Sequence, residues 1–200
     1  MAYRDFQLVD LQTKFNIVTK RAKLFPNALR IEPSLLLAQQ LERNHSHIRA
    51  RTEKMVSEAF VFPILLEIQD RNSSKITLFS GENLLADKSK GLNGELDFLF
   101  TKQPNAFDLT APIIAITEAK LDRALIKAAN QCAAQMIGSQ VFNQKNNQPA
   151  EVIYGAITNG SEWLFMKLEA NILTLDESEY FANDLPQLLG VLQTIIDFYE

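Results

Sequence analysis

Residues 94–100 read G-E-L-D-F-L-F and residues 115–121 read A-I-T-E-A-K-L, and these two runs decide the fold prediction. Both runs are apolar and strand-like, yet the first contains Asp97 and the second contains Glu118 and Lys120. A charge inside such a run is costly unless it is paired or binds a metal. The pattern therefore predicts two strands of a sheet that carry a polar site.

The composition predicts one globular domain. The chain has 200 residues, 46% of them hydrophobic, and no linker rich in Gly, Pro or Ser divides it. Cys132 is the only cysteine, which excludes an intrachain disulfide, and the first residues lack the apolar run of a signal peptide. The longest apolar stretches, such as residues 60–66, are far shorter than the roughly 20 residues of a membrane helix. We expect a cytoplasmic protein without a membrane partner.

Charge is spread unevenly along the chain, whose net charge is -4. Residues 1–57 hold ten Lys/Arg and five Asp/Glu, a balance of +5, whereas the remainder holds ten and nineteen, a balance of -9. One interpretation is that the N-terminal basic residues contact phosphates while the acidic part holds the site. The other is an ordinary solvated helical surface. The basic residues in question are Lys20, Arg21, Lys23, Arg30, Arg43, Arg49, Arg51 and Lys54.

Apolar periodicity predicts helices first and then strands. Helices are expected over residues 5–24, from Pro33 through 35–41, over 51–68 with a bend or restart at Pro63, over 122–142 and over 185–199. Strands are expected over 76–79, 95–100, 113–117, 152–158 and 163–168, the last two joined by a turn at Asn159-Gly160, with 172–175 as a further short strand. The fold class is α/β, with a mixed central sheet of about five strands flanked by helices. Its expected parts are an N-terminal helical extension (1–50), a core (51–170) and a C-terminal helix (180–200).

The three charged residues suit metal-assisted hydrolysis. Two carboxylates on neighbouring strands repel each other unless a hard divalent cation lies between them, and oxygen ligands suit Mg²⁺ or Mn²⁺. Glu118 and Lys120 are two residues apart, so on a strand their side chains share one face, and Ala119 faces the core on the other. The lysine can hold a water or steady the charge that develops on a phosphate. Phosphodiester hydrolysis fits these residue types.

The set Asp97 with Glu118-Ala119-Lys120 resembles the PD-(D/E)XK nuclease superfamily, which has the restriction-endonuclease-like fold. The resemblance covers roughly residues 55–168 and includes the hairpin after the long helix. It implies a divalent-metal-dependent nuclease, with DNA as the expected substrate, Asp97, Glu118 and Glu58 as metal ligands, and Lys120 as a catalytic residue. It also implies that Gln131 on the following helix orients the lysine or the substrate. Fold resemblance alone does not choose between restriction and repair enzymes.

Two further points follow from this resemblance. The family's Pro-Asp pair is replaced here by Leu96-Asp97, so the match rests on Asp97. Gln135 lies one turn after Gln131 on the same helix face. The predicted contacts with nucleic acid come from Arg49, Arg51, Lys54 and Gln135.

Structural alternatives remain open for each residue. Asp97 and Glu118 would also fit strand-end salt bridges with Lys120 and an arginine. Glu58 would fit an exposed helix charge, with Glu53 or Glu67 as ligand in its place, and Gln131 and Gln135 would fit plain surface hydrogen bonding. His45 and His47 lack the neighbours of a zinc site, Cys132 is interpreted as a small buried residue, and Trp163 as hairpin packing with base stacking as the alternative.

Two other classes of protein remain open as well. The first is a catalytically silent nuclease-like domain that binds nucleic acid or a protein partner, including one from a restriction system. The second is an unrelated α/β interaction protein, which would require Asp97 and Glu118 to lie far apart. A homodimer would suit the cutting of both DNA strands, and the C-terminal helix would offer an interface for it.

Overall fold

A single mixed sheet organises the chain in the computed structural model, which describes residues 2–48, 52–120 and 125–200. Its strands run in the order β1-β7-β6-β5-β4-β3-β2, and β8 pairs with β6, so the sheet has eight strands. The strands are β1 (Val18–Ala22), β2 (Thr77–Asp87), β3 (Leu92–Thr101), β4 (Ile113–Ala119), β5 (Val152–Thr158), β6 (Glu162–Glu169), β7 (Ile172–Asp176) and β8 (Tyr180–Phe181). The α/β class with a mixed sheet and flanking helices is confirmed, but the prediction of about five strands is wrong.

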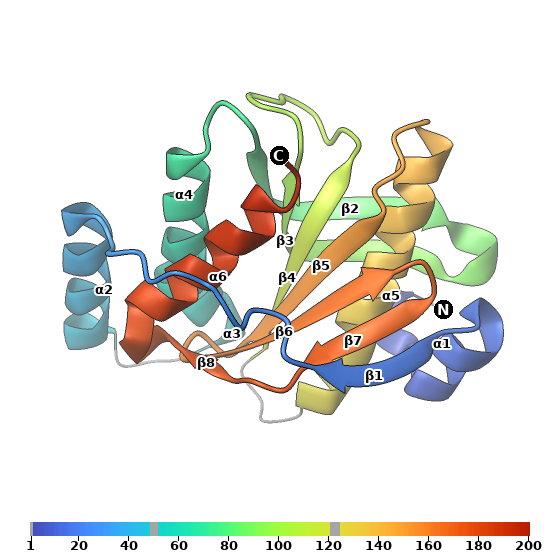
Figure 1. Ribbon diagram of the computed structural model, residues 1–200, viewed down its shortest axis with the longest axis horizontal. Coiled ribbons are helices and arrows are strands. Elements are labelled where there is room, and N and C mark those ends of the chain that lie inside the picture. Colours follow the sequence, from blue (N-terminus) through green and yellow to red (C-terminus); the bar gives the residue numbers. More distant parts are fainter. Residues whose placement is uncertain (1, 49–51, 121–124) are drawn as a thin grey trace.

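Helices cover both faces of this sheet. In Figure 1, α6 crosses in front of the strands and α5 lies behind them. The helices are α1 (Leu8–Phe15), α2 (Leu35–His47), α3 (Glu53–Val56), α4 (Phe62–Arg71), α5 (Leu125–Lys145) and α6 (Leu185–Asp197). Short helical turns are η1 (Tyr3–Asp5), η2 (Ser57–Val61), η3 (Lys88–Lys90) and η4 (Ala182–Asp184). The predicted helices at 35–41, 51–68, 122–142 and 185–199 correspond to α2, α3 to α4, α5 and α6, although residues 51 and 122–124 lie outside the described part.

The central part of the sheet is a meander followed by a crossover. β2 pairs antiparallel with β3, and β3 antiparallel with β4. The chain then crosses through α5 and returns as β5, which pairs parallel with β4. The expected hairpin is confirmed, because β5 and β6 pair antiparallel around Asn159 and Gly160, whose φ of 84° suits glycine. This order brings the ends of β3 and β4 together in front of α5.

The N-terminal prediction of one helix over residues 5–24 is wrong. α1 ends at Phe15, the next residue Asn16 has a left-handed φ of 55°, and the chain then extends as β1. β1 pairs parallel with β7 and forms one edge of the sheet. Its β-branched Val18 and Thr19 favour a strand, and pairing with β7 outweighed the imperfect helical period in the sequence. The first 50 residues therefore contribute a strand as well as helices.

Pro63 is accommodated by a change of helical pitch. α3, the π-helical turn η2 and α4 follow one another without a gap from Glu53 to Arg71. A proline has no amide proton to donate to the carbonyl four residues back, which here belongs to Ala59. The Ala59 carbonyl accepts a hydrogen bond from the side chain of Asn44 instead, at 2.6 Å. The predicted bend or restart thus takes the form of a π-helical turn, a feature found often near functional sites.

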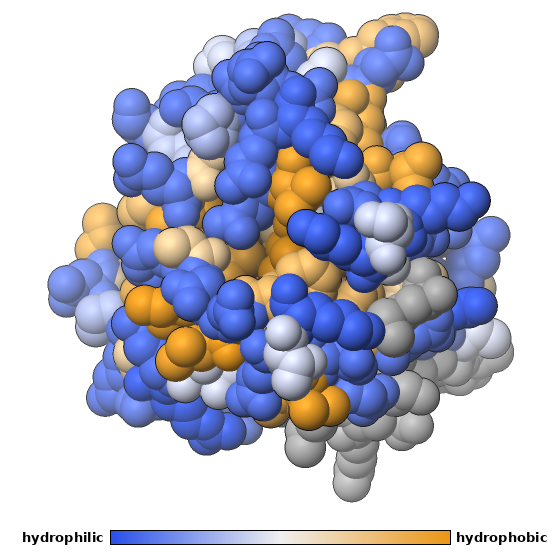
Figure 2. All heavy atoms as spheres, turned by 90° about the vertical axis from the view of Figure 1, so that its right-hand side faces the viewer, coloured by the Kyte–Doolittle hydropathy of each residue, from blue (hydrophilic) through white to orange (hydrophobic). Residues whose placement is uncertain are grey.

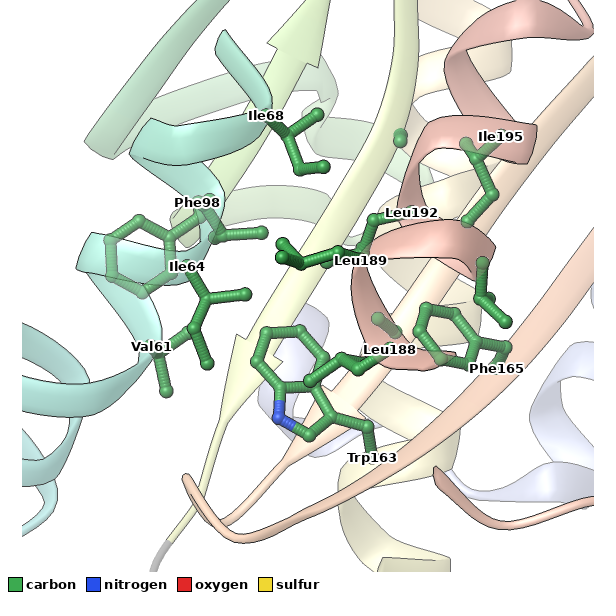
Figure 3. Close-up of a cluster of buried hydrophobic side chains, with 14 of the residues drawn as sticks. Val61, Ile64, Ile68, Phe98, Trp163, Phe165, Leu188, Leu189, Leu192 and Ile195 are labelled. Atoms are coloured by element: carbon green, nitrogen blue, oxygen red, sulfur yellow. The ribbon is translucent and has the colours of Figure 1, made fainter. Parts of the chain in front are cut away.

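Two apolar cores hold the layers together. Figure 3 shows the first, in which Ile64 and Ile68 of α4 and Leu189 and Leu192 of α6 meet between the helices and the sheet, with Trp163 beside them. The second lies on the opposite face, where α5, α1 and η1 cover the strands with small, aliphatic and aromatic residues. Each face of the central strands is thus sealed from water, so a charge on these strands is buried unless it lies at a strand end.

The face of the molecule drawn in Figure 2 is mainly hydrophilic. Figure 2 shows the face at the right of Figure 1, where hydrophobic residues gather in a band across a mostly polar surface. Within the described ranges, no helix is both long enough and apolar enough to span a membrane.

Candidate functional site

The candidate site lies where β3 and β4 separate. The last paired residues of this ladder toward the site are Phe98 and Thr117. One step further, the backbone N–H of Ala119 donates to Asp97 Oδ2 at 2.8 Å, so a carboxylate takes the place of a backbone acceptor. The N–H of Lys120 donates to the carbonyl of Thr158 at 2.8 Å, which keeps the end of β4 against β5. The split places Asp97 next to the segment that carries Glu118 and Lys120.

Glu118 is the buried centre of the site, with 0% of its surface exposed. Its Oε1 lies 2.8 Å from Lys120 Nζ, so the predicted sharing of one face by these two side chains is confirmed. Ala119 lies on the other face, in the core cluster that contains Phe98. Because Asp97 and Glu118 lie together, the structure does not favour the class in which they are distant surface charges.

Two glutamines of α5 orient Glu118. Gln131 Nε2 donates to Glu118 Oε1 at 2.5 Å, and Gln135 Nε2 donates to Glu118 Oε2 at 2.7 Å. They are one turn apart, so the i, i+4 spacing read from the sequence places both amides on the carboxylate. Gln135 also donates to the carbonyl of Glu95, at 3.3 Å. The plain surface interpretation of these glutamines is wrong, and so is a contact of Gln135 with nucleic acid at the surface, because Gln135 is fully buried.

The helix formed by α3, η2 and α4 brings two more carboxylates to the site. Glu53 Oε1 lies 3.1 Å from Lys120 Nζ, so Lys120 bridges Glu53 and Glu118. Glu58 instead lies 3.8 Å from Lys54 and is exposed over 63% of its side chain. Of the glutamates considered as the helix ligand, Glu53 therefore contacts the lysine. Glu67 does not contact Lys120 or line the pocket; its oxygens accept hydrogen bonds from Ser34 and Arg71.

A pocket of about 530 Å³ opens beside Asp97. One wall comes from α3, η2 and the start of α4, and the other from β2, β3 and the end of β4. Its lining residues are Glu53, Lys54, Ser57, Glu58, Phe62, Ser80, Gly81, Glu95, Asp97, Phe98 and Ala119. Four of these residues are acidic and one is a lysine, so the pocket favours a cation or an uncharged donor of hydrogen bonds over a free anion.

Burial and mutual repulsion set the pKa values of the site. Burial and the nearby charge of Asp97 raise the pKa of Glu118 to about 7, against the opposing effect of Lys120. Burial also raises the pKa of Asp97, although the Ala119 N–H and Lys120 oppose the shift. For Lys120, burial acts to lower the pKa, but the charges of Glu118, Asp97 and Glu53 outweigh it and raise the pKa. One lysine is thus insufficient to neutralise these carboxylates.

This excess of negative charge is what a divalent cation would relieve. Among the described residues, no group of three or more His, Cys, Asp or Glu side chains is arranged as a complete metal cage. Mg²⁺ does not require one, because it keeps several waters and binds through one or two carboxylates. Asp97 Oδ1 accepts no hydrogen bond from the described residues and Asp97 lines the pocket, so Asp97 is placed to hold such a cation. Glu118 is fully buried and both of its oxygens accept hydrogen bonds, so it would reach a cation only by exchanging one of these partners.

The predicted basic surface is dispersed. Lys20 and Arg21 lie on β1, at the sheet edge opposite β2, and Arg30 pairs with Asp184. Of the expected phosphate-binding residues within the described ranges, only Lys54 lines the pocket. Arg49 and Arg51 lie outside the described residues. Because these basic residues are spread over the molecule, most of them fit the interpretation of an ordinary solvated surface.

The remaining candidates have structural roles. Cys132 is fully buried, and burial raises the pKa of its thiol, as expected of a packing residue rather than a nucleophile. Trp163 is fully buried and stacks against Phe165, with ring centroids 6.3 Å apart, so hairpin packing is confirmed. His45 packs its ring 4.6 Å from that of Phe60 on the surface of α2.

Sequence reasoning did not identify Glu95, Phe62 or Ser80 as site residues. Glu95 is two residues before Asp97, and this strand spacing was a usable signal for a shared face. Ser80 and Phe62 had no such signal, because their position depends on how β2 and α4 pack around the split. A comparison of the chain with models of protein families gives no match, and a comparison with curated proteins gives no significant match.

Proposed function

We propose that this protein is a divalent-metal-dependent nuclease that hydrolyses phosphodiester bonds, with DNA as its substrate. The observation that carries the proposal is the buried Glu118 beside Asp97, with Lys120 as the one cation that pairs with Glu118 among the described residues, at a split in the sheet and next to an open pocket. The order of a meander, a crossover helix and a parallel strand also supports the resemblance to the PD-(D/E)XK superfamily. Resemblance in topology supports the fold type more strongly than it supports the activity.

The residues of the chain divide the work in the proposed mechanism. Asp97 and Glu118 would hold Mg²⁺ or Mn²⁺, which supplies polarisation of a phosphoryl oxygen and a lowered pKa of a water. Gln131 and Gln135 hold the Glu118 carboxylate in one orientation through their amide donors. The Ala119 N–H fixes Asp97 in the same way. Lys120 stays protonated and stabilises negative charge on the phosphate, and Glu53 positions its ammonium group.

Cleavage of supercoiled plasmid tests this proposal. The pure protein is incubated with Mg²⁺, Mn²⁺ or EDTA beside Asp97→Ala and Lys120→Ala, and Lys88→Ala serves as a control because Lys88 is exposed and outside the pocket lining. We expect nicking with either metal and none in EDTA. Lys120→Ala should lose at least about a hundredfold, since removal of a transition-state donor costs this much. Asp97→Ala should lose a similar factor, because it removes a proposed metal ligand. Full activity of Lys120→Ala would contradict the mechanism.

A second function has one observation in its favour. Both oxygens of Glu118 are already hydrogen-bonded, and Lys120 is held by two glutamates. A silent nuclease-like domain would keep such an arrangement closed and bind nucleic acid or a protein without cutting. Affinity for DNA that persists unchanged in EDTA, with no cleavage, would favour this class.

A further inference from the structure

The pocket beside Asp97 has an aromatic floor that metal-assisted hydrolysis does not require. Phe62 is half-buried and lines the pocket at the start of α4. Its ring is nearly parallel to that of Phe98, with centroids 6.2 Å apart and an interplanar angle of 27°. Phe98 is buried in the core between the sheet and α4, as Figure 3 shows. Phe62 therefore has a fixed ring behind it, and a flat group entering the pocket would extend this stack.

The pocket is open opposite Asp97. Gly81 lies in β2 between the paired residues Ser80 and Glu82, whose partners Phe98 and Leu96 flank Asp97. Its φ of 71° disfavours other residues, and a Cβ there would approach only Glu95 Oε1, at 3.7 Å. No side chain at this position narrows the pocket. The volume of about 530 Å³ falls within the range of small-molecule sites.

The charge of the pocket restricts what enters it. Glu53, Glu58, Glu95 and Asp97 line it, against Lys54 as the single cation among the described lining residues. A phosphate would be repelled by this wall except at a bound metal. A nucleobase is uncharged and flat, and its exocyclic amino groups can donate hydrogen bonds to carboxylates. Among the parts of a nucleotide, the base fits the pocket and the phosphate fits the metal position beside it.

We propose that this pocket binds one unpaired nucleobase stacked on Phe62, so that the substrate is single-stranded or locally unpaired nucleic acid. The inference rests on the proposed nuclease function for the position of the phosphate. In a duplex, the base is paired and stacked and would reach Phe62 only after it is unpaired, at an energetic cost. In a single strand the base is already unpaired, so this unpairing energy is not required. Stacking of bases on aromatic side chains also tolerates different sequences.

Quenching of 2-aminopurine fluorescence measures this stacking directly. A short single strand with one 2-aminopurine is titrated with the Lys120→Ala protein in Mg²⁺, so that cleavage does not consume it, and the same strand is then tested as a duplex. We expect the protein to quench the 2-aminopurine fluorescence of the single strand. We expect it to bind the duplex at least about tenfold more weakly. Equal binding of both forms without quenching would overturn the inference.

Variants at Phe62 distinguish stacking from folding. Phe62→Leu keeps an apolar side chain but removes the ring, and we expect loss of quenching with about tenfold weaker binding. Phe62→Tyr keeps the ring and should keep the quenching. Phe107→Ala is the control, because Phe107 is 99% exposed in the loop between β3 and β4 and lies outside the pocket lining. If Phe107→Ala removes the quenching and Phe62→Leu does not, the pocket is not the binding site.

The two proposals fail in different ways. Quenching that depends on Phe62, without cleavage of any DNA, would support the base pocket and contradict the nuclease. Metal-dependent cleavage that is equally fast on single strands and duplexes, and unaffected by Phe62→Leu, would support the nuclease and overturn the base pocket. Binding of an oligo-arginine peptide by the pocket, with no binding of the single strand, would show a site for cationic groups and would also overturn it.

Discussion

Glu118 and Glu67 are both buried, yet their surroundings give them opposite properties. Burial acts to raise the pKa of Glu67, but hydrogen bonds from Ser34 and Arg71 outweigh it, so its pKa is lowered. The pKa of Glu118 is raised to about 7 by burial and by the charge of Asp97. Glu67 is a carboxylate whose partners satisfy it, whereas Glu118 shares one lysine with two other acids. The difference identifies Glu118 as a functional candidate and Glu67 as a structural one.

Removal of the structural glutamate is expected to have a large effect on stability. Glu67→Ala leaves the Arg71 guanidinium and the Ser34 hydroxyl without the carboxylate that they contact at 2.6 Å. Breaking a buried pair costs roughly 3–5 kcal/mol, and because Arg71 can reach solvent we expect about 2–3 kcal/mol here. Urea unfolding followed by circular dichroism measures it. A loss below about 0.5 kcal/mol would show that the pair is a weak surface contact.

The functional glutamate is expected to show the opposite dependence on pH. Its folded pKa of about 7 exceeds the ordinary 4.5, so its contribution to stability is present below pH 4.5 and is lost as pH rises to 7. Glu118→Gln does not titrate, so its stability relative to the natural chain should rise over this window by up to about 3 kcal/mol. Urea unfolding in EDTA between these pH values measures the difference.

Glu67→Gln is the matched control for this pH series. Its folded pKa is lowered, so the stability that Glu67 contributes is present above pH 4.5 and is lost as pH falls through the folded pKa. The two glutamine variants should therefore diverge from the natural chain in opposite directions. Parallel stability curves for Glu118→Gln and the natural chain would contradict the raised pKa.

The helix glutamates provide a smaller test, on catalysis. Glu53 contacts Lys120 at 3.1 Å, whereas Glu58 contacts Lys54 at 3.8 Å and is largely exposed. We expect Glu53→Gln to lower the cleavage rate about tenfold through a misplaced lysine, and Glu58→Gln to change it by less than about threefold. Single-turnover cleavage at saturating Mg²⁺ measures both. The reverse order of effects would assign the helix role to Glu58, as the family resemblance implies.

Sequence alone identified the three charged residues at the centre of the site, because strand alternation and a charge within an apolar run are local signals. Asp97, Glu118 and Lys120 needed nothing beyond their own runs, whereas Gln131 came from the family resemblance and helical spacing then linked Gln135 to it. The same reasoning did not separate Glu67 from Glu118, since both stand in apolar runs. Arg71, at i+4, was a local hint to the role of Glu67, but Ser34 lies 33 residues away and is brought there by the packing of α2 on α4.

Long-range pairing also explains what the sequence did not predict in the fold. β1 exists because β7 offers it an edge 154 residues later, and the local period of residues 5–24 suggested a helix. The choice of Glu53 over Glu58 depends on where the helix stands relative to Lys120 and on the π-helical turn η2, which contains Glu58. Such distances arise from tertiary packing, which can override local propensity.

The central claim is that the negative charge of Asp97 and Glu118, which Lys120 does not balance, serves to bind a divalent cation. Calorimetric titration with Mn²⁺ tests this claim most directly. The natural chain, Asp97→Asn and Glu67→Gln are titrated at pH 8, above the pKa of Glu118. The account predicts saturable binding by the natural chain and by Glu67→Gln, and binding weakened at least about tenfold in Asp97→Asn. Equal affinity in Asp97→Asn, or no binding by the natural chain, would contradict it.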